Sequence, residues 1–287
     1  MWLILAVASA VFAALVSVLG KKGLAGVSSN LATGIRAIVA LALAWLVTFV
    51  TGSTAQLAAL TPNDLAFILL SGAATGASWL CFFKALQLGR VTDVIAIDRS
   101  SLLFTGLAAI ALFGETNHLA TKIIGLTVVV AATMLLVTRN QTDSATRRNW
   151  AWLPWALASM AFAVATTLLA KVGLASVDSS LATALRTVVV VVFATLIVWF
   201  RGEASSVRHI TRRHLVYLAA SGLATGASWL CYFGAIKLGE VSVVAPIDKL
   251  SIVFAAGLAA LLLGEKVSKR DALALAAMVL GTLILLY

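Results

Sequence analysis

Long apolar stretches separated by short polar segments dominate the chain. A helix needs roughly 20 apolar residues to cross about 30 Å of hydrocarbon. On that scale the first half holds stretches at 2–19, 31–50, 65–83, 91–113 and 119–137, and the second half at 152–170, 181–200, 215–233, 241–263 and 272–286. These runs are continuously apolar rather than alternating, which excludes a membrane β-barrel. The pattern predicts an all-α integral membrane protein with ten transmembrane helices.

The two halves repeat each other at a constant offset of 150 residues. Residues 71–81 read SGAATGASWLC, and residues 221–231 read SGLATGASWLC. A copy that crosses the bilayer five times forces the second copy to lie upside down relative to the first. Two inverted halves facing each other across a midplane are typical of secondary transporters. We therefore predict five-helix repeats at 1–139 and 150–287, joined by a linker at 140–149.

The composition supports a membrane protein and argues against a nucleic-acid partner, a metal and a cofactor. Hydrophobic residues make up 62% of the chain and charged residues 11%, against about 25% charged in soluble domains. The net charge of +10 is scattered between apolar runs and forms no basic, aromatic-interleaved stripe, so no nucleic-acid partner is expected. Cys81 and Cys231 lie in apolar runs, and neither they nor the histidines form a metal-binding pattern. We expect no metal and no cofactor.

The Lys and Arg residues predict the orientation, because loops that stay in the cytoplasm are enriched in them. One side would carry 13 of these residues, and the other only Lys122, Lys171 and Lys237. Equivalent loops differ in the same sense, since 51–64 has no Lys or Arg and 201–214 has four. We expect a multi-pass protein of the inner (cell) membrane with both termini outside the cytoplasm.

At this point the sequence resembles the EamA-type branch of the drug/metabolite transporter superfamily. The likeness rests on LFGE at 112–115, LLLGEK at 261–266, Gly125 and Gly281 in the spans that follow, and Arg36 and Arg186 early in the second and seventh spans. It implies ten helices in two inverted repeats, a central substrate cavity and export of small metabolites or drugs. Family members commonly place their termini in the cytoplasm, and their fourth span often lacks charges. The substrates of better-known members therefore transfer poorly to this chain.

Adjacent opposite charges inside two spans are the sharpest chemical signal. Asp98 and Arg99 lie in the fourth span, and Asp248 and Lys249 lie in the ninth. A charge near the bilayer centre costs at least about 2.5–3.5 kcal/mol, so such residues usually mark a substrate or ion pathway. We interpret them as a polar binding site near the midplane, with an aspartate that takes up a proton. The alternative is a pair of crossed ion pairs, Asp98 with Lys249 and Asp248 with Arg99, that only joins the halves.

Hydroxyl groups extend this polar surface. Ser101 and Ser251 follow the two aspartates by three residues, which places them on the same helix face. Ser78 and Ser228 belong to serine and threonine stripes in the third and eighth spans, and the second stripe continues to Tyr232. Such hydroxyls either line a cavity or bond backbone carbonyls and pack helices.

Each of the remaining candidate residues has either a binding role or a purely structural role. Trp79 and Trp229 lie in mid-span, where they either stack on an aromatic or cationic substrate or fill helix crossings. Arg36 and Arg186 either hold a carboxylate or phosphate or extend to the interface. Glu115, at a helix end beside a glycine, is expected to be solvated and structural.

These observations favour a secondary active transporter that exports a small polar or amphipathic metabolite by alternating access. An amino-acid-like zwitterion fits a cavity that holds both signs of charge. A proton-coupled exporter of cationic drugs, a lipid-headgroup flippase and a membrane scaffold that transports nothing are the alternatives. The sequence contains no P-loop and no His-Glu-x-x-His motif, so an enzyme is not expected. The partners expected are a small-molecule substrate, protons and the lipid bilayer, and the fused halves can complete a monomer.

Overall fold

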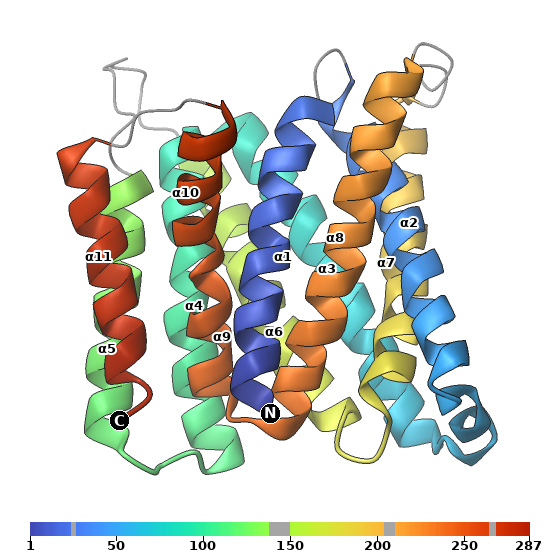
Figure 1. The fold of residues 1–287 in the computed structure, drawn as a ribbon, viewed down its shortest axis with the longest axis horizontal. Helices are drawn as coiled ribbons and strands as arrows, with labels where there is room; N and C mark the ends of the chain where they lie inside the picture. Colours follow the sequence, from blue (N-terminus) through green and yellow to red (C-terminus); the bar gives the residue numbers. More distant parts are fainter. Residues whose placement is uncertain (24–26, 138–149, 204–209, 264–267) are drawn as a thin grey trace.

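The computed structural model describes residues 1–23, 27–137, 150–203, 210–263 and 268–287, and these residues form helices without any strand (Figure 1). The helices of the first half are α1 (Trp2–Gly23), α2 (Ser29–Val50), α3 (Pro62–Leu88), α4 (Val91–Phe113) and α5 (Leu119–Val137). Those of the second half are α6 (Leu153–Gly173), α7 (Ser179–Phe200), α8 (Arg212–Leu238), α9 (Val241–Lys249), α10 (Ser251–Leu263) and α11 (Lys269–Ile284). The predicted linker at 140–149 lies outside the described residues.

The all-α membrane fold predicted from the sequence is confirmed. Within the described residues, 9 spans are long and apolar enough to cross a bilayer, and each coincides with a predicted stretch. The ninth of these spans joins α9 and α10. The helix α11 packs along α5. It has 16 residues and is therefore shorter than the nine spans. The tenth crossing, expected at 272–286, stays a prediction.

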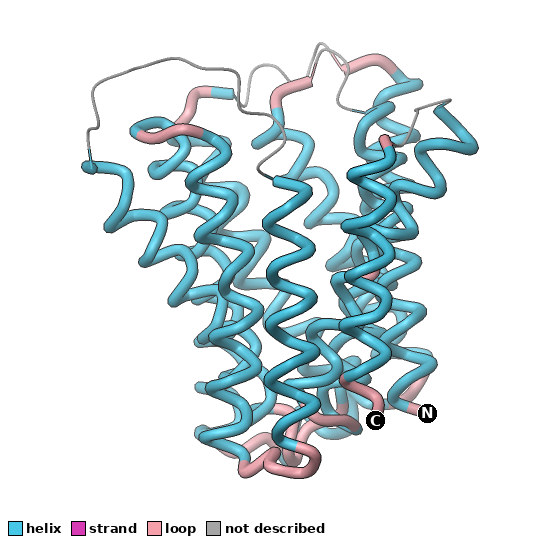
Figure 2. Tube along the Cα trace, turned by 90° about the vertical axis from the view of Figure 1, so that its left-hand side faces the viewer, coloured by secondary structure: helices cyan, strands magenta, loops and turns pink. Residues whose placement is uncertain are grey.

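The two copies run in opposite directions. Both termini lie on one face of the molecule, which we call the terminal face (Figures 1 and 2). The opposite face, where α1, α3 and α7 end and α8 begins, we call the basic face. The helix α1 starts at the terminal face, whereas its counterpart α6 starts at the basic face (Figure 1).

The basic residues divide between these faces as the sequence predicts. Those described at or near the basic face are Lys21, Lys84, Arg90, Arg201, Arg212, Arg213, Lys269 and Arg270, and those at the terminal face are Lys122, Lys171 and Lys237. This division is the one that the positive-inside rule would place with the basic face in the cytoplasm.

Side-chain caps start equivalent helices in the same way in both copies. Ser28 and Asp178, which are 150 residues apart, accept bonds from backbone N–H groups at the starts of α2 and α7. Thr61 and Thr211 do the same for α3 and α8. Each cap satisfies a backbone donor that has no partner within its own helix.

The halves are interlocked rather than separate. The most extensive helix contacts join α1 to α8 and α3 to α6, and each pair takes one helix from each copy (Figure 1). The helices α2 and α7, also from different copies, pack together as well. The sequence repeats therefore do not form independent lobes, and their junction runs through the middle of the molecule.

Two glycines of the repeated segment make this junction possible. A Cβ atom at Gly72 of α3 would lie 2.7 Å from the backbone oxygen of Arg186, and one at Gly222 of α8 would lie 3.0 Å from that of Arg36. Only glycine allows such close approach of two helix backbones, and close backbone packing is a main source of helix association in lipid. The duplicated glycine thus has the same function in both copies.

Four serines of the same segment bond the first helix of the opposite copy. Their hydroxyls donate to backbone oxygens, and the bonds are Ser71 to Thr166 (2.7 Å), Ser78 to Ser159 (3.0 Å), Ser221 to Val16 (3.1 Å) and Ser228 to Ser9 (3.1 Å). Hydrogen bonds of this kind between helices are worth about 0.6–2 kcal/mol each in a membrane. Of the two roles expected for these hydroxyls, backbone bonding is the one they share.

The ninth span is broken, whereas its counterpart α4 is continuous. The helix α9 ends at Lys249, α10 begins at Ser251, and the backbone N–H of Leu250 bonds the oxygen of Ile247 (3.0 Å), which tightens the turn between them. Pro246 lies inside α9, where it removes a backbone donor and disfavours regular helix. The equivalent residue of α4 is Ala96, which has neither effect.

Replacing Gly72 by Val tests the glycine contact. The added side chain meets backbone that cannot move aside, so we expect destabilisation of about 1–3 kcal/mol and a lower unfolding temperature in detergent. Gly257→Val is the matched control, because a Cβ atom at Gly257 meets nothing within 4 Å. Equal shifts for both variants would show that the junction does not depend on Gly72.

Candidate functional site

A cavity of about 320 Å³ lies where α3, α4 and α6 meet the end of α9. It is lined by Ser78, Trp79, Phe82, Asp98, Arg99, Ser101, Ala163 and Lys249. Ser78 and Ala163 are each ten residues from the basic-face end of their helix, about 15 Å at 1.5 Å per residue. Asp98 is seven residues from the start of α4, or about 10 Å. Ala163 is the middle residue of α6, and Lys249, the ninth residue of α9, lies nearer the terminal face. The cavity therefore lies near mid-depth, with most of its lining toward the basic face.

This cavity gathers residues that the sequence analysis proposed independently. Ser78, Trp79, Asp98, Arg99, Ser101 and Lys249 all belong to its wall. Its lining combines one carboxylate, two cations, two hydroxyls and an aromatic wall, completed by Phe82. Pockets that bind small molecules typically join a largely apolar wall to a few convergent polar groups.

Each aspartate is connected to a pair of serines drawn from both copies. Ser159 of α6 donates to Asp98 (3.4 Å between oxygens), and its hydroxyl lies 3.3 Å from that of Ser78. In the other copy, Ser9 of α1 donates to Asp248 (2.7 Å), and its hydroxyl lies 3.2 Å from that of Ser228. The same polar triad is thus built twice, with a long hydrogen bond at Asp98 and a short one at Asp248.

Ser9 and Ser159 are site residues that the sequence analysis missed. Each lies in the first helix of its copy, and the two are 150 residues apart. A hydroxyl in the same position of both copies was the available signal. It is weak by itself, because serine is common in membrane helices and nothing in the sequence names its neighbour.

The two aspartates lie at different depths. Each is the eighth residue of its helix, but α4 starts at the basic face and α9 at the terminal face. At 1.5 Å per residue each carboxylate lies about 10 Å below a different face. Each aspartate has its own serine pair instead of facing the other, and only Asp98 lines the cavity.

Neither crossed ion pair is present among the described residues. The single ion pair at these positions joins the neighbours Lys249 and Asp248, with 4.0 Å between Nζ and Oδ2. Adjacent residues diverge by about 100° on a regular helix, but α9 ends at Lys249 and the chain turns there. Lys249 therefore contacts its own neighbour and also reaches the cavity wall.

Arg186 and Trp229 belong to a second, closed group. The Arg186 side chain is 3% exposed, donates a hydrogen bond to Thr75 (2.9 Å), and lies 4.0 Å from the ring centre of Phe233 and 5.8 Å from that of Trp229. Cation–π contacts of a desolvated guanidinium are worth about 2 kcal/mol. The space beside Arg186 is only about 10 Å³, which is too small for a substrate.

The other candidates lie outside the cavity wall. Arg36, the counterpart of Arg186, is half-buried and donates to Thr33 of its own helix (3.1 Å). Tyr232 is half-buried, and its hydroxyl lies 3.5 Å from that of Thr167. Ser251 is half-buried at the start of α10.

A polar network joins the end of α4 to the start of α9 at the terminal face. Glu115, at the end of α4, accepts hydrogen bonds from the backbone N–H groups of Val241 and Ser242 at the start of α9 (2.8 Å each). Lys122 donates to the Glu115 backbone oxygen (2.8 Å) and pairs with Glu240 (2.7 Å). The carboxylate complements both the free donors and the positive dipole of the α9 N-terminus. We call this network the terminal-face latch.

The expectation that Glu115 is solvated is wrong, because the residue is 6% exposed. Its charge is stabilised by two backbone donors of the other copy rather than by water. The expected structural role agrees with these contacts. The counterpart, Glu265, lies outside the described residues.

Inverted, interlocked halves with a charged cavity between helices are an architecture that many membrane transporters share. The sequence matches the EamA-like transporter family over residues 1–138 and 150–287. The chain belongs to this family, which is part of the drug/metabolite transporter superfamily, and it is a multi-pass membrane protein with a transporter role.

Individual relatives agree with this assignment. Over 134 residues the chain is 48% identical to an "uncharacterized transporter in cobO 3'region" from Sinorhizobium sp., and the alignment spans 47% of this chain and 95% of that protein. A solved structure described as "Crystal structure of protein" superposes with a TM-score of 0.76 at 14% identity, covering 99% of this chain and 96% of the other. This second likeness concerns the fold alone.

The latch is tested by replacing Glu115 with Gln. A neutral amide accepts the two backbone bonds less well, so we expect the terminal face to open more often. The measurement is the labelling rate of a thiol at Ile247, which is 1% exposed, in a variant with Cys81 and Cys231 replaced by Ala. We expect labelling by a membrane-impermeant maleimide from the terminal face to rise several-fold.

Asp64→Asn is the control for this experiment, because Asp64 caps α3 at the same face but is half-buried and bonds Thr61 and Ser176 instead of the start of α9. An unchanged labelling rate in Glu115→Gln would show that the latch does not close the terminal face.

Proposed function

We propose that the protein is a secondary active transporter of a small zwitterionic metabolite, with an amino-acid-like molecule as the favoured substrate. The observation that supports the proposal most strongly is the presence of Asp98 and of the cations Arg99 and Lys249 in the wall of one cavity. Its volume of about 320 Å³ suits a small molecule. No catalytic group is needed for this role.

The proposed binding mode follows from the charges. The Asp98 carboxylate accepts hydrogen bonds from the substrate ammonium group, and Arg99 and Lys249 donate hydrogen bonds to the substrate carboxylate. Such charge-assisted hydrogen bonds are about twice as strong as neutral ones. Trp79 and Phe82 supply an apolar wall for a side chain. Ser78 and Ser101 add hydroxyls that donate or accept.

The proposed direction is export by alternating access. The terminal-face latch joins the two copies at one side, and most of the residues that line the cavity lie toward the basic face. The positive-inside rule assigns the basic face to the cytoplasm, so both termini would lie outside the inner membrane. In this state the substrate enters from the cytoplasm, and opening of the latch, with closure at the basic face, releases it outside.

The alternatives differ in what they require of the cavity. A cationic drug would meet Arg99 and Lys249, which repel it, so the lining favours a zwitterion. Protons remain the proposed coupling ions, with the Asp98 carboxylate binding either a proton or the substrate ammonium group, so that each displaces the other. Crossed ion pairs would have given these charges a purely structural role, and the described residues do not form them. We propose a functional monomer, because the two copies already complete the cavity, and no nucleic-acid partner.

Replacing Asp98 by Asn tests the site. In proteoliposomes that exchange labelled amino acids, we expect transport to fall at least about tenfold, because a charge-assisted bond of about 1.5–3 kcal/mol is lost. Asp93→Asn is the control, since Asp93 lies on the same helix but is half-exposed and pairs with Arg90 (3.9 Å). Equal activity of the two variants would remove Asp98 from the site.

Replacing Lys249 by Gln separates the zwitterion from the cationic drug. Loss of the lysine should weaken transport of an amino acid but improve that of a cation, because a repulsive charge is gone. The measurement compares amino-acid and cationic-dye fluxes under an imposed pH gradient. Cation flux that falls together with amino-acid flux, or an absence of amino-acid flux in the unaltered protein, would contradict the proposed substrate.

A further inference from the structure

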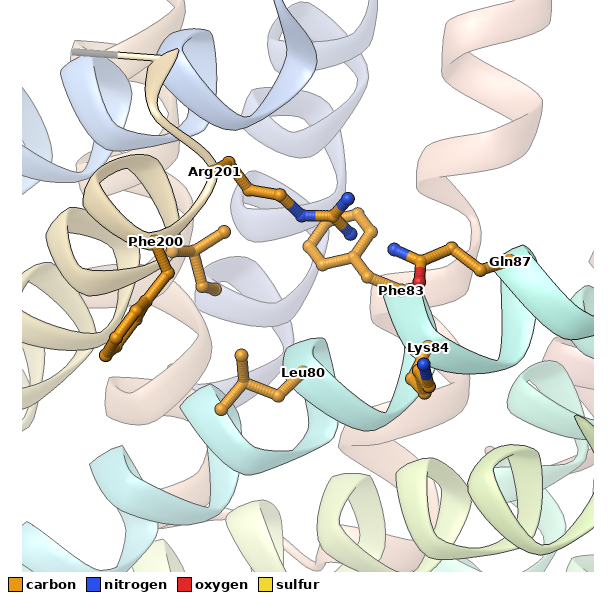
Figure 3. Close-up of a pocket in the computed structure, with 7 residues that line it drawn as sticks. Leu80, Phe83, Lys84, Gln87, Phe200 and Arg201 are labelled. Atoms are coloured by element: carbon orange, nitrogen blue, oxygen red, sulfur yellow. The ribbon is translucent and has the colours of Figure 1, made fainter.

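A second cleft opens at the basic face between the end of α3 and the end of α7 (Figure 3). Its volume is about 240 Å³, and it is lined by Leu80, Phe83, Lys84, Gln87, Ile197, Phe200 and Arg201. None of these residues lines the cavity at Asp98. The transport site described above does not use this cleft.

The cleft carries two cations and no acid. Lys84 and Arg201 are both exposed, and neither makes an ion pair within the described part of the chain. Figure 3 shows Arg201 reaching from the end of α7 toward Gln87 of α3. With its oxygen facing the guanidinium, the Gln87 amide accepts a bond from Arg201 (3.0 Å), which holds that side chain over the cleft.

Apolar side chains continue the cleft on its deeper side. Leu80 is 46% exposed and Phe200 76% exposed. Leu80 lies one helical turn below Lys84, about 6 Å further from the basic face. A ligand that fits must therefore pair an anionic group at the face with an apolar group beside the helices.

The other copy does not repeat this arrangement. The positions equivalent to Lys84 and Arg201 are Gly234 and Thr51, which carry no charge. Lys237, which stands in the position of Gln87, donates to the backbone oxygen of Val177 (2.7 Å) and is occupied within the protein. Among the described residues, the cleft at the basic face therefore has two cations without an acidic partner, and the equivalent positions of the other copy do not.

We propose that this cleft binds the phosphate headgroup of an anionic phospholipid. Lys84 and Arg201 contact the phosphate oxygens, and the acyl chains lie along Leu80 and Phe200. Basic recesses between transmembrane helices at the cytoplasmic side suit anionic headgroups. A soluble phosphate would leave the apolar side uncovered, so the lipid is the ligand that matches the whole cleft.

The experiment measures lipid binding to the purified full-length protein in detergent by native mass spectrometry. We expect phosphatidylglycerol to bind more tightly than phosphatidylcholine, and the double variant K84Q/R201Q to bind phosphatidylglycerol about 10- to 30-fold more weakly. The control K269Q/R270Q removes the same charge from exposed residues of the same face and should bind normally. The variant K84R/R201K keeps both positive charges and should bind phosphatidylglycerol as the unaltered protein does. Normal binding by this variant would show that the loss in K84Q/R201Q comes from the missing charges.

Three results would overturn the proposal. Equal weakening in K84Q/R201Q and K269Q/R270Q would reduce the effect to the general charge of the face. Equal binding of the two lipids would remove the role of the anionic group. Displacement of phosphatidylglycerol by millimolar inorganic phosphate would assign the cleft to a free anion instead.

Discussion

The structure depends on close contact between the backbones of two inverted copies. In lipid there is no hydrophobic driving force between helices, so close packing at small residues and hydrogen bonds must hold the helices together. Here a glycine at the same position of each copy admits the neighbouring backbone, and serines of the same segment bond the carbonyls of the opposite first helix. The most strongly repeated segment of the chain is therefore the one that joins the halves.

That junction also positions the two aspartates inside the spans. Ser159 and Ser9 reach Asp98 and Asp248 because α6 and α1 are each held against the third helix of the other copy. A carboxylate in a low-dielectric interior needs hydrogen-bond donors, and each aspartate receives one from the opposite half. Helix packing and polar chemistry are thus two consequences of the same contact.

The two copies are alike in sequence but not in structure. Asp98 lines an accessible cavity, whereas Asp248 has the shorter hydrogen bond, and Arg186 is enclosed by aromatic rings whereas Arg36 is half-buried. Such a difference is what a transporter built from inverted repeats requires, because exchanging the conformations of the copies would exchange the open face. Pro246, whose counterpart in α4 is Ala96, adds a further difference.

The sequence predicts the helices, the repeat and the division of basic residues well, because hydropathy and loop charge act locally. It also selects Asp98, Arg99 and Lys249, since charges are rare inside apolar spans. It misses Ser9, Ser159 and the burial of Glu115, because these depend on which helix of the other copy lies opposite. Periodicity identifies the polar face of a helix but does not show which helix packs against that face. For this reason the sequence also allowed crossed ion pairs, which the described residues do not form.

The accessibility of a single thiol at Ala163 tests the account most directly. Ala163 lies half-buried in the wall of the charged cavity and donates or accepts nothing through its side chain. In protein lacking Cys81 and Cys231, a membrane-impermeant reagent should label Cys in place of Ala163 from the basic face, and the transported solute should slow this labelling. A thiol that is unreactive from both faces, or whose labelling no transported solute affects, would contradict a substrate cavity between the two halves.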